Sequence, residues 1–287
     1  MRKIISVLAG ALAVVLASGT ASAAVALPFG LYQSGNNLQY SFAQVPDYAI
    51  QFYGWQEAFQ AADVQAAWDA GTESFLELQT CGNPCDQATS VPLANVAAGD
   101  YDTYLKTFAD AAESFGHPVL MTFDHEMNGS WYPWDAADGG TSTGVTPAQW
   151  IAAWDHVTSL ISGIAPNVEW VWAPNIEQGG SAVSAFWPGS GGHVSYVGLD
   201  GYYVNTGTTW ANRFQSSYRD VESASGGSYP FMVAETAIPP GDSNAVSQID
   251  DLFSGARSVG AVAVMYFDKG AYVMTSAMES EFVTAAG

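Results

Sequence analysis

Short apolar runs alternate with longer amphipathic stretches along most of this chain, and this alternation constrains the fold more than any other feature. Eight apolar runs have the length of strands, at residues 28–33, 49–53, 74–78, 119–123, 168–172, 194–199, 231–234 and 261–267. Helix-like stretches fall between most of them, at residues 57–69, 101–115, 147–164, 210–223, 246–258 and 278–285. Parallel strands buried on both faces are continuously apolar, as these runs are. The pattern predicts the α/β class and a single-domain (β/α)8 barrel, or TIM barrel.

The spacing and the ends of these elements fit that architecture. Without its first 23 residues the chain has 264, or about 33 for each strand–helix unit. Thr146 before Pro147 is a good helix start, and Gly116, Gly226 and Gly260 lie where helices are expected to end. A doubly wound open sheet is the alternative. The sequence QSGNNLQY after the first run lacks the glycine pattern of a nucleotide-binding turn.

The first 23 residues have the three parts of a secretory signal peptide. Arg2 and Lys3 form a positive start, residues 4–16 an apolar segment, and residues 21–23, ASA, a small-residue cleavage pattern. A transmembrane anchor is the alternative, but the apolar segment is short and no charged stop-transfer sequence follows it. The sequence therefore predicts a secreted protein whose one barrel domain occupies residues 24–287.

The chain is strongly acidic. It has 28 Asp and Glu against 7 Lys and Arg, a formal net charge of −21, and loss of Arg2 and Lys3 would bring this to about −23. So acidic a surface repels nucleic acids, anionic lipids and anionic polymers. No later segment approaches the roughly 20 apolar residues of a membrane span. We therefore expect a neutral or cationic partner, neither nucleic acid nor membrane.

Cys81 and Cys85, in the sequence CGNPC, are the only cysteines. In an exported chain a disulfide across this tight turn is expected. Because the closed loop is so short, the bond would shape the loop rather than add much stability. A zinc site would need two further soft ligands at similar spacing, and the sequence has none.

Two glutamates stand at predicted strand ends, where (β/α)8 barrels carry their active groups. Glu126, directly after His125, follows the fourth run, and Glu235 directly follows the seventh. We expect both to face the barrel mouth from opposite sides. Two such carboxyls suit cleavage of a glycosidic bond, because one protonates the leaving oxygen while the other attacks the sugar or activates water.

The sequence leaves two points about this pair open. A carboxyl separation of about 5–5.5 Å would mean retention of the anomeric configuration and roughly 6.5–9.5 Å would mean inversion. A buried structural ion pair is the alternative to catalysis. That alternative is disfavoured because only five basic residues remain after the first 23 are removed.

Metal and serine chemistry fit the sequence poorly. The His-Glu pair lacks the second histidine of an HExxH helix, because Gly129 stands in its place. His117, His156 and His193 are scattered near expected helix ends or loops. The sequence DAADG at residues 135–139 lacks the spacing of a calcium loop, and no Gly-x-Ser-x-Gly occurs. We predict neither metal nor cofactor.

The motif around the first glutamate resembles a known family. HEMNGSWYPW at residues 125–134 is similar to the signature of glycoside hydrolase family 26, a family of retaining barrel glycosidases. The likeness continues in EWVWAPN, YVGLDGYY, AET and VMYFDK, at the fifth to eighth runs and in the family's order. It therefore covers most of the chain after the first 23 residues.

The resemblance implies a role for each matching residue. Glu126 takes the place of the acid/base and Glu235 that of the nucleophile. His125 would help hold these groups and meet the sugar, and Trp131 would pack in the floor of the site. Tyr202 matches a tyrosine that donates a hydrogen bond to the nucleophile, which favours its ionised form.

Other positions remain open or depart from the family pattern. Tyr203 is the alternative to Tyr202, because strand register decides which of the two points inward. Thr122 stands where mannan-cleaving members often carry Arg. Residues 77–79, ELQ, replace a frequent His, and Phe267 lies where some members have Trp. These changes leave the catalytic pair intact but weaken the case for mannose.

Several aromatic residues are candidates for sugar binding. We assign Trp134, Trp172 and Phe267 to the substrate site, with core packing as the alternative for Trp134, Trp172 and Trp187. The sequence as a whole predicts a secreted, monomeric, retaining endo-β-glycanase acting on neutral β-1,4-linked mannan or glucomannan. The alternatives are a β-1,3-1,4-glucanase, a β-1,3-xylanase and a non-catalytic polysaccharide-binding protein.

Overall fold

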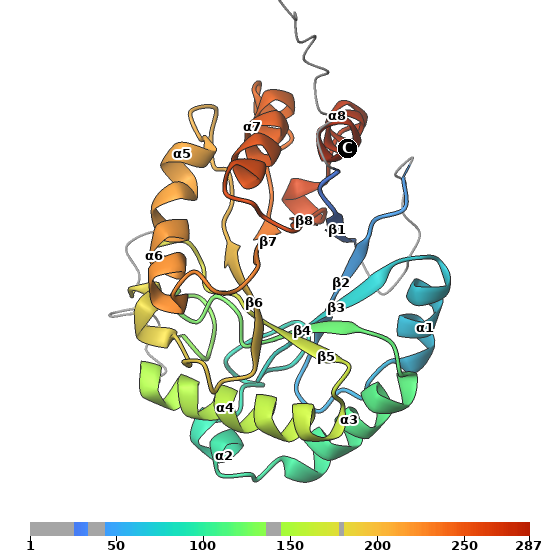
Figure 1. Cartoon of the computed structure of the whole chain (residues 1–287), viewed down its shortest axis with the longest axis vertical. Helices are drawn as coiled ribbons and strands as arrows, with labels where there is room; N and C mark the ends of the chain where they lie inside the picture. Colours follow the sequence, from blue (N-terminus) through green and yellow to red (C-terminus); the bar gives the residue numbers. More distant parts are fainter. Residues whose placement is uncertain (1–25, 34–43, 136–144, 178–180) are drawn as a thin grey trace, which may run out of the picture.

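A closed barrel of eight parallel strands forms the centre of the molecule. The computed structural model describes residues 26–33, 44–135, 145–177 and 181–287, so the predicted signal peptide lies outside the described residues. The strands follow one another around the barrel in chain order, and Figure 1 shows helices on its outside. The strands are β1 (Phe29–Tyr32), β2 (Tyr48–Tyr53), β3 (Glu73–Leu78), β4 (Val119–Phe123), β5 (Val168–Trp172), β6 (Val194–Asp200), β7 (Phe231–Thr236) and β8 (Val264–Phe267).

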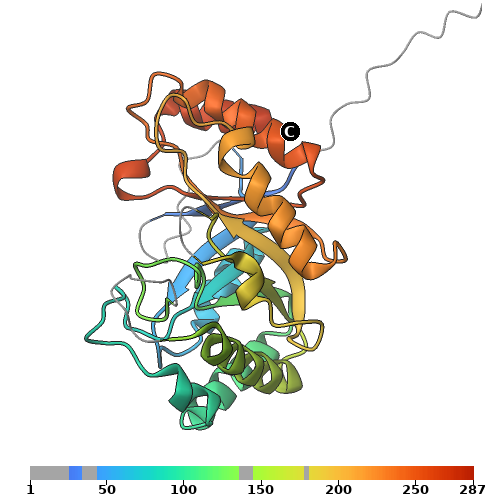
Figure 2. The same cartoon turned by 90° about the vertical axis from the view of Figure 1, so that its left-hand side faces the viewer.

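Helices follow most of the strands, and together with the closed parallel barrel they confirm the predicted (β/α)8 fold. In Figures 1 and 2 alike, α3 and α4 lie toward one end of the longest axis and α7 and α8 toward the other. The helices are α1 (Ala61–Asp69), α2 (Leu93–Ala97), α3 (Asp102–Phe115), α4 (Pro147–Ile164), α5 (Trp210–Arg213), α6 (Gln215–Ser225), α7 (Ala245–Ser258) and α8 (Ser276–Ala286). Two 3-10 turns are η1 (Val183–Phe186) and η2 (Gly270–Tyr272).

The helix ends predicted from capping residues and glycines are observed in the structure. Thr146 caps α4 by accepting from the Gln149 backbone N–H, while the Gln149 side chain accepts from the Thr146 N–H. Gly116 and Gly226 end α3 and α6 in the left-handed region, with φ of 74° and 72°. The predicted helix at 210–223 is in fact two helices, because Phe214 interrupts it with a ψ of −35° after a φ of −102°.

Two apolar layers hold the fold together. The larger lies between the strands and the surrounding helices. The smaller fills the barrel with side chains from alternate strand positions, among them Phe75, Leu120, Val171 and Met232. Gly30 on β1 allows this filling, because a Cβ there would lie 2.3 Å from Met265 Sδ. Packing on both sides explains why the strands are apolar at successive positions.

The predicted disulfide is present and lies in the loop between β3 and α2. Cys81 and Cys85 are bonded to each other. The backbone N–H of Trp55, just after β2, donates to the Cys81 carbonyl at 2.6 Å. The closed loop thus packs against the end of the neighbouring strand. None of the described helices is long and apolar enough to cross a membrane.

Candidate active site

A cavity of about 330 Å³ opens at the C-terminal ends of the strands. Both predicted glutamates line it, one after β4 and one from β7. Aromatic rings make up most of the remaining wall. The lining residues are Phe52, Glu126, Trp131, Tyr132, Asn175, Tyr202, Glu235, Phe267 and Tyr272.

Two hydrogen-bond donors hold Glu126 at an uncommon backbone conformation. Asp124 and Glu126 follow the end of β4 with positive φ angles of 46° and 53°. Residues other than glycine keep such angles only where their surroundings impose them. Trp131 Nε1–H donates to Glu126 Oε2 at 2.6 Å, and the Asn175 amide donates to Oε1. The carboxyl is therefore fixed on both oxygens.

Asn175 is itself braced by the motif that carries Glu126. Its backbone N–H donates to Asn128 Oδ1 at 2.8 Å, and Asn128 Nδ2 donates to the Asn175 carbonyl at 2.7 Å. This reciprocal pair ties the β5 end to the β4 end. We did not single out either asparagine from the sequence, although both lie inside the motifs HEMNGSWYPW and EWVWAPN.

Glu235 lies in β7 and has a different set of neighbours. The Tyr202 hydroxyl donates to Glu235 Oε1. The other oxygen, Oε2, is buried and has no hydrogen-bond partner among the described residues. Tyr203 points away from the cavity, because it is fully buried and donates to Asp251 Oδ2 at 2.9 Å. Of the two tyrosines that the sequence left open, Tyr202 is thus the one against Glu235.

Burial raises the pKa of both cavity glutamates. The pKa of Glu126 rises to about 7, although the Asn175 and Trp131 hydrogen bonds oppose the rise. The pKa of Glu235 rises to about 8 because of burial and then the nearby Glu126, while the Tyr202 hydroxyl opposes it. Burial of the two neighbouring carboxyls thus favours a protonated carboxyl in the cavity near neutral pH.

His125 is buried behind the cavity wall rather than in it. Its side chain is 1% exposed, and burial lowers its pKa to about 3, so the ring is neutral. Nδ1 lies 3.2 Å from Glu77 Oε2, and Nε2 lies 3.2 Å from the Tyr132 hydroxyl. We expected His125 to meet the sugar directly. The structure instead puts Tyr132 between the imidazole and the cavity.

The other predicted aromatic residues divide between cavity and core. Trp131 is 52% exposed and lines the cavity, as does Phe267. Trp134 and Trp172 are 1% and 0% exposed, and their indole N–H groups donate to the His125 and Phe186 carbonyls. This burial corrects their assignment to the substrate site and fits the core-packing alternative. Trp187 packs edge-on against Trp172 at 5.0 Å, away from the cavity.

A carboxylate organises the loop that carries Trp131. Asp135 Oδ2 accepts from the Trp131 backbone N–H and from the Tyr132 N–H, the latter at 2.7 Å. Burial raises the pKa of Asp135 to about 7 against these hydrogen bonds. The sequence offered Asp135 only as part of an incomplete calcium loop, whose later residues lie outside the described part of the chain. Its observed contacts are with backbone N–H groups.

The described residues contain no group of His, Cys, Asp and Glu arranged to hold a metal ion. His117 stacks on Trp68 at 4.4 Å, and His156 Nε2 lies 2.7 Å from Asp102 Oδ1. His193 is exposed. These three histidines lie away from the mouth. His117 and His193 lie in loops, as expected from the sequence, whereas His156 lies in the middle of α4.

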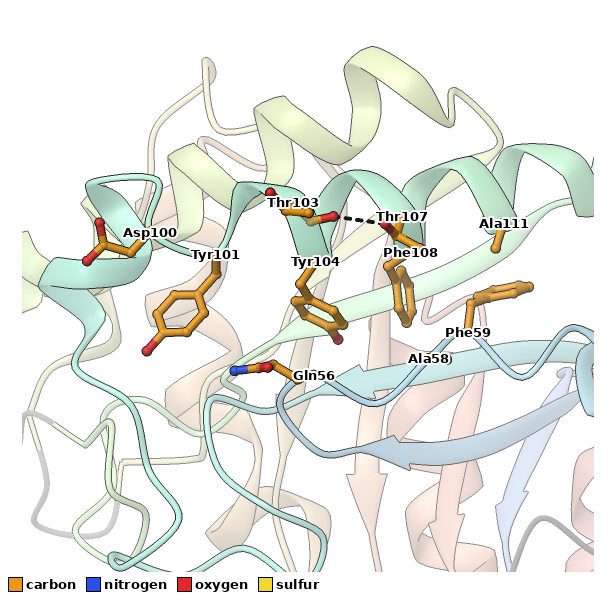
Figure 3. A pocket seen from close by; sticks show the side chains of 10 residues that line it. All are labelled: Gln56, Ala58, Phe59, Asp100, Tyr101, Thr103, Tyr104, Thr107, Phe108 and Ala111. Carbon is orange, nitrogen blue, oxygen red and sulfur yellow. Dashed lines mark hydrogen bonds between the residues drawn. The ribbon is translucent and has the colours of Figure 1, made fainter.

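A larger cavity of about 560 Å³ lies on the outer wall, between α3 and the segment that follows β2. Figure 3 shows Tyr104 and Phe108 of α3, and Tyr101 just before it, projecting toward the segment that carries Gln56 and Phe59. Asp100 is the single carboxylate among its lining residues, and neither cavity glutamate takes part. The smaller cavity, at the strand ends, is the one that contains the paired carboxyls Glu126 and Glu235.

A (β/α)8 barrel with two buried glutamates in an aromatic-lined mouth has the architecture of a glycoside hydrolase. The sequence profile described as Glycosyl hydrolase family 26 matches residues 91–236. The chain belongs to this family.

Individual relatives are more distant. The chain is 27% identical over 219 residues to Endoglucanase H of Acetivibrio thermocellus. The aligned region covers 74% of this chain and 23% of that protein. It thus spans about a quarter of the length of this curated relative. Similar solved structures include a modular endo-β-1,4-mannanase from Cellulomonas fimi, with a TM-score of 0.68, 13% identity, and coverage of 91% of this chain and 70% of that one. The catalytic domain of a Bacillus sp. JAMB-750 endo-β-1,4-mannanase is also similar, with a TM-score of 0.66 and 14% identity. This match covers 91% of this chain and 85% of that one. Because these identities are low, the similar structures show a shared fold and nothing more specific.

Proposed function

We propose that this chain is a secreted retaining endo-β-glycanase that hydrolyses β-1,4-linked mannan or glucomannan, with Glu126 as acid/base and Glu235 as nucleophile. The observation that carries the proposal is the cavity at the strand ends, where two buried carboxyls are held by different donors. Aromatic walls suit stacking on sugar rings, and the acidic chain suits a neutral polymer.

In a double-displacement mechanism each of the two carboxyls has its own role. Glu235 Oε2 attacks the anomeric carbon while the Glu126 proton passes to the glycosidic oxygen. That C–O bond breaks, its electron pair stays on the departing oxygen, and a glycosyl ester forms on Glu235. Ionised Glu126 then takes a proton from water, whose oxygen attacks the same carbon and releases Glu235. Two inversions at one carbon give net retention.

This mechanism needs a protonated Glu126 and an ionised Glu235. Burial raises the pKa of both carboxyls, so a proton is available to the site near neutral pH. The Tyr202 hydroxyl supports the required order, because its hydrogen bond favours the ionised form of Glu235. The two roles rest on that contact and on the sequence motif around Glu126.

The choice of sugar has two main candidates. The endo-β-1,4-mannanases among the similar structures favour mannan. A β-1,3-1,4-glucanase is the second candidate, since the relative named Endoglucanase H and the small Thr122 in place of an arginine both favour it. Release of products from glucomannan, galactomannan, barley β-glucan and β-1,3-xylan would decide between them and a β-1,3-xylanase. The largest kcat/KM identifies the sugar.

Replacing Glu235 tests the catalytic assignment. We expect Glu235→Ala to lower kcat by at least about 10³-fold, because no other group can form the ester. Azide, a small nucleophile, should partly restore turnover and yield an α-glycosyl azide, whereas Glu126→Ala with azide should yield the β-anomer. The matched control is Glu113→Ala on the exposed face of α3, which should keep full activity. Full activity of Glu235→Ala, or reversed anomers, would reject the roles.

A non-catalytic binding protein is the competing class. It predicts retardation of the unaltered chain in polysaccharide gels without release of reducing ends.

The secretion proposal is tested separately by the mass of the exported protein. This mass should correspond to a chain that begins at Ala24 if residues 1–23 are removed.

A further inference from the structure

Glu77 is a buried acid at the barrel mouth that the proposed mechanism does not use. It lies in β3, where its neighbours in register are Phe52 on β2 and Thr122 on β4. Its side chain is 2% exposed, and Oε2 lies 3.2 Å from His125 Nδ1. This contact lacks the alignment of a hydrogen bond, and neither atom has a hydrogen-bond partner among the described residues.

The surroundings of Glu77 disfavour a negative charge there. Burial, and then the cavity glutamates Glu235 and Glu126, raise its pKa well above the usual range. Asp200 on β6 is another buried acid of this group, and Phe52 on the β2 side brings no charge. His125 offers no cation in return, because burial keeps its ring neutral. A neutral acid beside a neutral imidazole is therefore the favoured state of this contact.

The position of one proton at this contact determines what the cavity presents to a sugar. If the Glu77 O–H donates to Nδ1 of His125, the imidazole proton must lie on Nε2. Nε2 is 3.2 Å from the Tyr132 hydroxyl, which then accepts, so its own proton is free to point elsewhere. Tyr132 lines the cavity, and its ring is clamped by stacking on Trp134 at 4.5 Å.

We propose that Glu77 is a positioning residue that, as a neutral acid, sets the tautomer of His125 and thereby directs the Tyr132 hydroxyl proton into the cavity as a donor to a sugar oxygen. An ionised Glu77 would instead put the imidazole proton on Nδ1. Nε2 would then accept from Tyr132, and the phenol would offer the substrate only lone pairs. The inference rests on the proposed function for its kinetic consequence but not for the tautomer itself.

The tautomer can be read without substrate. The chain has four histidines, and the variant carrying His117→Gln, His156→Gln and His193→Gln leaves His125 as the single histidine signal in ¹⁵N NMR spectra. We expect Nδ1 to be unprotonated and Nε2 to be protonated at pH 6. A protonated Nδ1 would overturn the proposal whether or not the chain proves to be a glycanase.

Kinetics of three variants test the consequence for the sugar. Glu77→Gln keeps an uncharged donor next to Nδ1, so its kcat/KM should stay within about threefold of the parent and both limbs of its pH profile should keep their positions. Glu77→Ala and Tyr132→Phe should each lose about tenfold or more, and the double variant should be no worse than Tyr132→Phe alone. Unfolding curves confirm that each variant is folded before the comparison is made.

Two results would overturn the positioning role. If Glu77 is ionised in the parent, Glu77→Gln removes a negative charge beside Glu126 and Glu235, and both limbs of the pH profile move to lower pH. If Glu77 only fills space, the losses of Glu77→Ala and Tyr132→Phe add independently. Absence of any glycan hydrolysis by the parent would reject the proposed function and leave the NMR result to judge the tautomer.

Discussion

At the scale of single residues, the contact between Trp131 and Glu126 predicts a shift in pH dependence. The indole N–H donates to Glu126 Oε2 at 2.6 Å and favours the ionised carboxylate. Trp131→Phe keeps a ring but removes this donor, so the pKa of Glu126 should rise further. Because the proposed acid must be protonated, the high-pH limb of kcat should move to higher pH, by up to about one unit. Trp187→Phe, away from the cavity, is the control, and a shift to lower pH would contradict the assignment.

The residues whose place at the barrel mouth could be predicted are those whose position follows from local sequence pattern. Glu126 and Glu235 lie at ends of apolar runs, and their place at one mouth follows from the barrel. Glu77 and Asn175 gain their roles from partners that follow another strand, and Tyr132 gains its role from contacts within its own loop. Those pairings depend on rotamers and on the bend of the loop after β4. No periodicity in the sequence carries that information.

At the scale of elements, the cap of α4 predicts a small and separable loss of stability. Thr146 Oγ1 accepts from the Gln149 N–H at the helix start. Thr146→Ala removes this acceptor and should cost about 1 kcal/mol of unfolding free energy, whereas Thr146→Ser should cost little. Chemical denaturation measures the difference. Activity should not change, and equal stability of the two variants would show that the cap contributes nothing.

Elements with strong local signals were predicted more closely than the others. β4, β5 and α4 have the predicted bounds, since continuous apolar runs and a capping sequence mark them. α2 was missed because it is only five residues long. β8 begins at Val264 rather than at residue 261, although Val262 and Ala263 already make backbone hydrogen bonds to β7. Tertiary contacts, rather than local propensity, decide such short or marginal segments.

At the scale of the whole molecule, the number of buried acids predicts an unusual dependence of stability on pH. Burial raises the pKa of Glu73, Glu126 and Asp135 to about 7 and that of Glu235 to about 8. In the unfolded chain these groups have values near 4. Between about pH 4 and pH 8 the folded chain therefore binds more protons than the unfolded chain, so its stability falls as pH rises through this window.

Thermal unfolding at constant ionic strength should therefore give a Tm that is highest near pH 4 to 5 and several degrees lower at pH 8. Glu73 makes a clean probe, because it lies at the opposite end of the barrel from the cavity, where the nearby Glu169 adds to the effect of burial. Glu73→Gln should flatten part of the decline without altering the pH profile of hydrolysis. A Tm that increases steadily from pH 4 to pH 8 would contradict the raised pKa values. It would also contradict the inference that the folded chain binds more protons than the unfolded chain in this pH range.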